Sequence, residues 1–418
     1  MNMKLVFALF GCCLLLPFQC MLSSFVYLDS DAFPKCGYAV LLSPFYNAVS
    51  VTTQTLMLFL GEYAAAWKFA MFSLPLAALL CAVPILGVDD GWGDTELRFK
   101  VTFGAILGIA FVNTGVFQSS TAALASRLSG DTYGPLQEWW SIGVVFAGVF
   151  SAVVASAVQL AAGGQAALIV QFGFCVLLMS ASFVCMTILV RQGVFSDEPM
   201  PPMEPSPPCS HARYPEEWDT QGPMTPSPGG SSSPLLKRPS SVVFTVADGL
   251  LRAWPFLLSM FLVYVQGSLV FPLVIQKWTP PSYLAPELFG IVTVLTVQVF
   301  DLVGRLICLS RKFQRAVRVG NHNIWYLLAL GMFMPVGCFL SWRMEEHAFL
   351  GSLYTRLVLL ASLGLSQGLL TNLIFSWASV EAAIGSRSIV ARALPLSLCI
   401  GIVVGSAVSS TVVSMLEH

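Results

Sequence analysis

Charged side chains are scarce in this sequence of 418 residues. Only 10% of the residues are Asp, Glu, Lys or Arg, whereas 56% are hydrophobic and the mean hydropathy is +0.77. A water-soluble fold cannot hide so much apolar surface in its core. The shortage of charge therefore excludes a soluble enzyme and predicts an integral membrane protein.

Other chemical signatures are missing as well. The formal net charge of −1 provides no basic field for nucleic acid, and the eleven cysteines contain no CxxC pair. We therefore expect no nucleic-acid partner, no metal and no disulfide framework. The sequence also lacks the GxxxxGKS or GxxxxGKT motif of ATP-binding loops, so we expect no cofactor and no primary pump.

Long apolar runs are what the chain does contain. About 20 helical residues cross a hydrocarbon core of roughly 30 Å. Six runs of this length precede a polar interval and five follow it. They lie at 5–28, 38–61, 69–88, 101–127, 137–162, 166–190, 249–275, 288–310, 323–342, 349–380 and 392–416. The sequence thus predicts an all-α polytopic membrane protein with about eleven transmembrane helices.

The polar interval divides the chain into three parts. Pro, Ser and Gly dominate it, and such a composition buries too little apolar surface to offset the entropy of ordering. We predict an N-terminal six-helix bundle (1–191), a flexible cytoplasmic linker (192–248) and a C-terminal five-helix bundle (249–418), with the two bundles related by pseudo-symmetry.

The distribution of Lys and Arg predicts the orientation, because cytoplasmic loops retain these residues. With the N-terminus inside, fourteen Lys and Arg residues fall in cytoplasmic segments and five in extracellular ones. We therefore predict a cytoplasmic N-terminus and, with an odd number of spans, an extracellular C-terminus. Lys4 and the apolar residues after it also suit a secretory signal peptide, although the run continues past Pro17 to residue 28, the length of a span.

Two motifs have the form of catalytic signatures. Gly364–Gly368 (GLSQG) fits the nucleophile elbow of hydrolases, and Gly91–Asp94 (GWGD) is similar to the GxGD of intramembrane aspartyl proteases. The first lies in an apolar helix and no histidine lies in a predicted span. The second lies in a hydrophilic acidic loop. Close helix packing and a solvated loop are the better interpretations, so we expect no enzyme.

Two ionisable residues, Asp301 and Arg305, lie deep in the predicted span 288–310. Each would cost roughly 2.5–3.5 kcal/mol if it faced lipid. Their i, i+4 spacing puts them on one helical face, where they can pair and line the bundle interior. The pair either locks helices together or lines a substrate path, and we favour the second interpretation.

Uncharged hydrogen-bonding side chains recur at interior depth in several spans. Taken singly, each is more often a bond between helices. Together with one Asp/Arg pair, they describe a cavity for a polar but uncharged molecule such as a nucleobase or a sugar. The set comprises Gln19, Asn47, Thr52, Gln54, Asn113, Gln118, Ser119, Thr121, Gln266, Ser268, Gln298, Gln367 and Asn372.

Several segments resemble the equilibrative nucleoside transporter family. They are LLPFQCMLSSF at 15–25, YNAVS at 46–50, FVNTGVFQSS at 111–120, QVFDLVGR at 298–305 and FPLVIQKW at 271–278. The fourth is similar to the eighth-helix signature of the family, and the last resembles members from parasitic protists. The resemblance implies eleven helices in a 6+5, major-facilitator-like arrangement with a large cytoplasmic loop between the halves.

The resemblance also implies roles for individual residues. Arg305 would contact ribose hydroxyls, Asp301 would hold and orient that guanidinium, and Gln118 would read the base. A guanidinium fork suits vicinal hydroxyls, and a carboxamide can both donate to and accept from a purine edge. Gln19 and Leu22 would line the pocket from the first helix, with Gln19 standing where the family has asparagine.

Gln54 and Gln298 complete the predicted substrate ligands, and Lys68 is the predicted gating residue. In the family, a basic residue entering the third helix is paired with an acidic residue entering the eleventh. Residues 385–393 (GSRSIVARA) provide Ser and Arg at that place instead of an acid. The resemblance therefore leaves the partner of Lys68 open.

We predict facilitative transport of nucleosides or nucleobases, purines favoured, across the plasma membrane by alternating access. Lipid and substrate are the expected partners, and no oligomer is required. Three alternatives stay open: a major-facilitator-like carrier of a sugar or an amino acid, a proton-coupled nucleoside carrier in which Asp301 titrates, and a receptor or scaffold whose linker binds partners.

Overall fold

The computed structural model describes residues 2–24, 27–34, 36–59, 65–88, 91, 94–129, 135–194, 242–271, 273–284, 286–310, 312–313, 317, 323–381 and 387–417. All regular structure in these residues is helical. The first helices are α1 (Met3–Ser23), the π-helix η1 (Leu28–Ala32), α3 (Tyr38–Phe59), α4 (Ala65–Val88), α5 (Thr95–Ile109), the π-helix η2 (Ala110–Phe117), α6 (Gln118–Leu128) and α7 (Leu136–Arg191). They are followed by α8 (Val242–Val270), α9 (Leu273–Lys277), α10 (Pro286–Cys308), α12 (Asn323–Arg343), α13 (Leu353–Glu381) and α14 (Arg387–Glu417).

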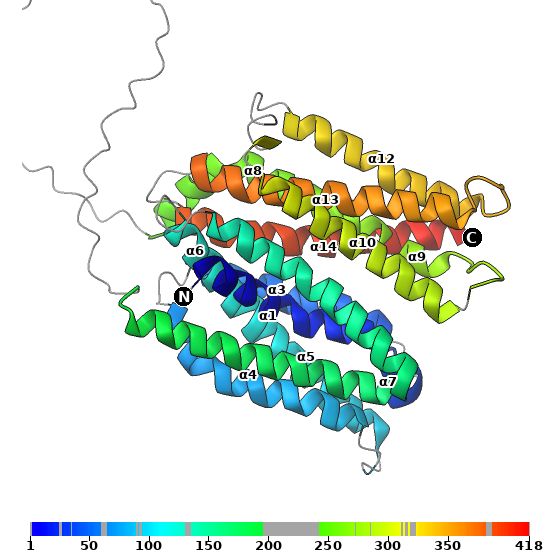
Figure 1. The fold of residues 1–418 in the computed structure, drawn as a ribbon, viewed down its shortest axis with the longest axis horizontal. Coiled ribbons are helices and arrows are strands. Elements are labelled where there is room, and N and C mark those ends of the chain that lie inside the picture. Colours follow the sequence, from blue (N-terminus) through cyan, green and yellow to red (C-terminus); the bar gives the residue numbers. More distant parts are fainter. Residues whose placement is uncertain are drawn as a thin grey trace, which may run out of the picture.

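Helix α7 consists of two antiparallel arms. Its 56 residues would measure about 84 Å if straight, far more than a membrane thickness. Gly163 interrupts it with φ 85° and ψ 174°, a backbone conformation open to glycine. Figure 1 shows the chain turning back there, so that a first arm (136–162) and a second arm (164–191) lie side by side. These arms match the predicted spans 137–162 and 166–190.

Each of the eleven predicted apolar runs corresponds to a helix, a set of consecutive helices or one arm of α7 in the described residues. Eight helical segments are long and apolar enough to cross a membrane, with α7 counted once and α5 to α6 counted as one segment. Counting both arms of α7 and adding α3 and α12 gives eleven. Helix α3 is not among the eight because Ser, Thr, Asn and Gln interrupt its apolar residues. The N- and C-termini lie at opposite ends of the bundle, as an odd number of passes requires (Figure 1).

Helices pack closely where glycine removes the side chain between them. A Cβ on Gly143 of α7 would lie 1.9 Å from the carbonyl oxygen of Ala8 on α1. On α13, a Cβ on Gly364 would lie 2.4 Å from the carbonyl oxygen of Val297 on α10. Such close contacts between small residues hold helices together in lipid, where the hydrophobic effect does not drive helices toward one another.

Helices α1–α7 form what we call the N-terminal half, and α8–α14 the C-terminal half. The surface where they meet is the seam. Helix α7 ends at Arg191 and α8 begins at Val242, six residues before the predicted linker boundary at 248. Residues 195–241 of the predicted linker lie outside the described residues, so the division into two bundles stays a prediction. We call the end of the molecule that holds Arg191 and Val242 the linker end.

Candidate functional site

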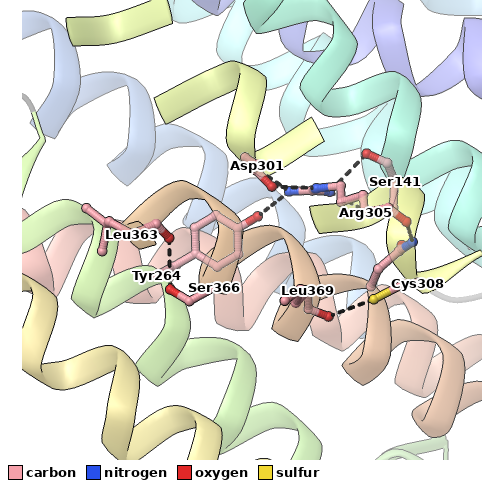
Figure 2. A network of polar contacts seen from close by, with 9 residues as sticks. Ser141, Tyr264, Asp301, Arg305, Cys308, Leu363, Ser366 and Leu369 are labelled. Atoms are coloured by element: carbon pink, nitrogen blue, oxygen red, sulfur yellow. Dashed lines mark hydrogen bonds and ion pairs between the residues drawn. The ribbon is translucent and has the colours of Figure 1, made fainter. Parts of the chain in front are cut away.

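Asp301 and Arg305 form the ion pair that their spacing predicts. Both lie on α10 and are buried, with 6% and 2% of their surface exposed. The Nε atom of Arg305 donates to Oδ1 of Asp301 at 2.9 Å, and Nη2 donates to Oδ2 at 3.3 Å. The two charges therefore compensate each other inside the protein (Figure 2).

The remaining donors of Arg305 reach two other helices. Nη1 donates to the carbonyl oxygen of Ser141 at 2.9 Å and to its hydroxyl at 2.5 Å. Nη2 also donates to the hydroxyl of Tyr264 at 3.1 Å. A guanidinium has five N–H groups, and these five contacts engage all of them. In this conformation Arg305 has no donor left for a ligand.

Helix α13 contacts the backbone of both residues of the pair. A Cβ on Gly368 would lie 2.1 Å from the carbonyl oxygen of Asp301, so only glycine permits this approach. Asn372 donates from Nδ2 to the carbonyl oxygen of Arg305 at 3.0 Å. Among the described residues, the Oδ1 atom of Asn372 is buried without a hydrogen-bond partner. This free acceptor lies on the helix that fixes the backbone of the pair.

Two of the predicted amide ligands lie together. The Nε2 atom of Gln54 on α3 donates to the carbonyl oxygen of Thr114 at 2.9 Å and to Oε1 of Gln118 at 3.2 Å. Thr114 and Gln118 lie in and directly after the π-helix η2, a distortion that is common at functional sites. Gln54 also reaches the sulfur of Cys399 on α14 at 3.5 Å. Its own Oε1 is buried and has no hydrogen-bond partner in the part of the chain that the structure describes.

Three other predicted ligands are half-buried. Gln298 packs against α7, where a Cβ on Gly148 would lie 2.3 Å from its Oε1. Leu22 on α1 packs against the hydrophobic core. Gln19 is on the same helix. Within the described residues, no hydrogen bond joins Gln19 to Asp301 or Arg305, so their common pocket stays a prediction.

Lys68, the predicted gating residue, lies near another cation, Arg392, among the described residues. Lys68 on α4 is 6% exposed, and Arg392 on α14 is close enough for the two charges to interact. Arg392 donates to the carbonyl oxygens of Ser388, at 3.1 Å, and Met57, at 3.3 Å. Residues 385 and 386 of the eleventh-helix stretch lie outside the described residues.

Sequence reasoning did not identify Ser141, Tyr264 or Glu138. Glu138 is 5% exposed near the start of α7, and Ser376 on α13 is its hydrogen-bond partner. An acid at the second position of the predicted span 137–162 was a signal for it. A serine or a tyrosine in an apolar helix carries no such signal.

The contacts that join the two halves gather toward the linker end. They connect α3 and α6 with α14 and the first arm of α7 with α10 and α13. Trp140 and Phe375 add an edge-to-face ring contact, with centroids 5.7 Å apart. The hydrogen-bonded pairs across the seam, within the described residues, are Gln54 with Cys399, Met57 with Arg392, Ser141 with Arg305, and Glu138 with Ser376. The seam is thus closed at the linker end.

No family model and no curated protein matches this sequence. Solved structures do match it. The fucose:proton symporter FucP of E. coli has a TM-score of 0.60 at 11% identity, covering 100% of this chain and 91% of that chain. A bacterial homologue of the iron transporter ferroportin, in an outward-facing state, has a TM-score of 0.61 at 12% identity, covering 98% of this chain and 91% of that one. A peptide transporter of the POT family has a TM-score of 0.54 at 12% identity, covering 100% and 91%.

At these identities the likeness shows the fold alone. The chain is an all-α polytopic membrane protein that shares its fold with FucP, a transporter of the major facilitator superfamily. The predicted fold class is therefore confirmed. The resemblance to equilibrative nucleoside transporters is left as a proposal.

Proposed function

We propose that this protein is a facilitative carrier of nucleosides and nucleobases, with purines preferred. The fold supports transport by alternating access, because such folds place one site near the membrane midplane between two halves that rock against each other. The resemblance of residues 298–305 to the eighth-helix signature of nucleoside carriers supports the substrate class.

The observation that carries the proposal is the buried Asp301–Arg305 pair beside the seam. Its charges sum to zero, which suits an uncharged ligand. Guanidinium donors match the vicinal hydroxyls of a ribose, and the carboxylate orients the guanidinium. Gln54 and Gln118 add amide groups that can bind a purine edge, and Gln54 has a free acceptor for it.

The proposal includes a location and an orientation. The excess of Lys and Arg supports a cytoplasmic N-terminus and linker, with the C-terminus on the other side of the membrane. The plasma membrane is the location that we propose. The closed linker end would then face the cytoplasm, and the site would load from outside. The cycle needs substrate and lipid as partners and no second copy of the chain.

A proton-coupled carrier is the second candidate, and Glu138 is the observation that favours it. Its carboxyl lies buried at the seam with a serine as hydrogen-bond partner, and no described residue forms an ion pair with it. A carboxyl in such surroundings costs less when it holds a proton. Opening of the seam would expose it to water and allow the proton to leave.

Uptake into proteoliposomes tests the proposed function. A panel of radiolabelled purine and pyrimidine nucleosides, nucleobases, sugars and amino acids identifies the substrate class, and we expect competable uptake of adenosine or hypoxanthine. Arg305→Ala should abolish it. Arg252→Ala is the matched control, because Arg252 pairs with Asp248 at the same i, i+4 spacing but both side chains are exposed.

Each other result has a clear meaning. Normal adenosine uptake in Arg305→Ala would remove the proposed site. Uptake of sugars or amino acids without nucleosides would contradict the substrate class. A wild-type protein with no flux of any solute would instead support the receptor or scaffold alternative.

A further inference from the structure

Arg305 is held by both halves of the molecule. Its partners Asp301 and Tyr264 lie on α10 and α8, in the same half as Arg305. Ser141 lies on the first arm of α7, in the other half, and accepts two hydrogen bonds from Nη1. These two bonds cross the seam; Figure 2 shows Ser141 beside the guanidinium.

The guanidinium cannot gain a ligand without losing a present partner, because its five N–H groups already have five contacts. Asp301 and Tyr264 would move together with Arg305 if the halves separated. Ser141 would not. Ser141 is therefore the partner that must leave both when the linker end opens and when a ligand binds Nη1.

We propose that Ser141 is a positioning residue that holds Arg305 in the closed conformation, and that a substrate hydroxyl replaces it on Nη1. The inference rests on the proposed function, because it concerns the same site. A bound hydroxyl then removes two of the hydrogen bonds that close the linker end. Occupancy of the site thereby favours the conformation that opens toward the linker end.

The neighbourhood of Ser141 provides a native reporter of this opening. Cys308 follows Arg305 by less than one helical turn, is 1% exposed and donates to the carbonyl oxygen of Leu369 at 3.3 Å. The ring contact of Trp140 with Phe375 covers the same part of the seam. Glu138, on the first arm of α7, is close enough to Cys308 for the two groups to interact, so separation of α7 from α10 would uncover the thiol to a reagent.

Three variants isolate the hydroxyl of Ser141. Ser141→Ala removes it and keeps the backbone carbonyl, and Ser141→Thr restores a hydroxyl. Ser151→Ala is the matched control on the same arm of α7. Ser151 is also buried, but its hydroxyl contacts Ser23 and Gln171 within the N-terminal half.

Two measurements on the purified full-length protein are needed. The first is the rate at which N-ethylmaleimide modifies Cys308 without substrate, followed by mass spectrometry of the peptide that contains it. The second is the adenosine concentration that gives half-saturation. A hydrogen bond to a charged group shifts an equilibrium by about tenfold. We expect Ser141→Ala to raise the labelling rate about three- to tenfold and to lower the half-saturating concentration about threefold.

The control variants should behave like the wild type. Unchanged labelling in Ser141→Ala, or weaker adenosine binding, would overturn the proposal. Equal acceleration in Ser151→Ala would also overturn it, because any lost buried hydroxyl would then loosen the helix. If the wild-type protein binds no nucleoside, the proposed function fails, whereas the labelling comparison still decides whether Ser141 closes the seam.

Discussion

Arg305 is a buried cation whose every N–H group has an acceptor, and one of those acceptors, Asp301, cancels its charge. Such a pair is not by itself a source of stability, because removing two charges from water costs about as much as their attraction returns. Losing one partner is a different matter, since the other charge is then left buried alone. A substitution that removes only one of the two charges should therefore destabilise the protein.

Asp301→Asn should destabilise the protein by about 3–5 kcal/mol, because it keeps the shape of the side chain and leaves Arg305 uncompensated. Chemical unfolding in detergent micelles measures the loss. Asp248→Asn breaks an exposed pair of the same spacing and should cost less than about 1 kcal/mol. Similar losses in the two variants would contradict the energetic role of burial.

Residue chemistry explains which parts of the site could be predicted from sequence. Two opposite charges in an apolar run must find each other, so the Asp301–Arg305 pair follows from spacing alone. Ser141 could not be predicted, because its partner Arg305 is 164 residues away and serine is common in membrane helices. The contact between Gln54 and Gln118 likewise depends on how α3 packs against the π-helix η2.

At the scale of elements, α10 and α13 are joined by backbone contact. Gly364 and Gly368 on α13 lie against α10, where added side chains would meet the carbonyl oxygens of Val297 and Asp301. The GLSQG motif is thus a packing surface, as its apolar context predicts. The same contact fixes the backbone that carries the ion pair.

Gly368→Ala should cost about 1–3 kcal/mol, because the new methyl group forces α13 away from α10. The temperature of unfolding in detergent reports it. Gly290→Ala, on α10, provides the comparison, since a Cβ there meets nothing within 4 Å. That variant should be neutral or stabilising by up to about 1 kcal/mol. A destabilised Gly290→Ala with an unaffected Gly368→Ala would refute the close approach.

Element boundaries were largely predictable, since the length of an apolar run sets the length of a span. The predicted span 69–88 corresponds to α4 at Ala65–Val88, and 323–342 corresponds to α12 at Asn323–Arg343. Local distortions were not predictable. The π-helix η2 lies inside the single predicted span 101–127, and its register depends on the polar partners that neighbouring helices offer.

At the scale of the whole molecule, two sets of helices close the seam at the linker end. Helices α3 and α6 meet α14, and the first arm of α7 meets α10 and α13. Alternating access requires both sets to separate together, because a seam joined on one side cannot open. Contacts in the two sets should therefore be coupled in their effect on transport.

The proposed facilitative mechanism predicts that uptake stops at equal concentrations inside and outside. An inward-directed proton gradient across the liposome membrane should not change this end point, and Glu138→Gln should preserve it, because no net proton movement drives the cycle. Time courses of adenosine uptake at several gradients measure it. Accumulation beyond equality that disappears in Glu138→Gln would establish the proton-coupled candidate instead.

The polar composition of α3 has a consequence for biosynthesis. Gln54 and its C-terminal partner Cys399 are separated by 345 residues, an interval that a ribosome adding about 5–20 residues per second crosses in roughly 17–70 s. Throughout that time α3 must sit in the membrane with hydrogen-bonding groups that α14 has not yet arrived to cover. The nascent N-terminal half should therefore depend on insertion machinery or membrane chaperones, and a chain that ends before α14 should be a target of quality control.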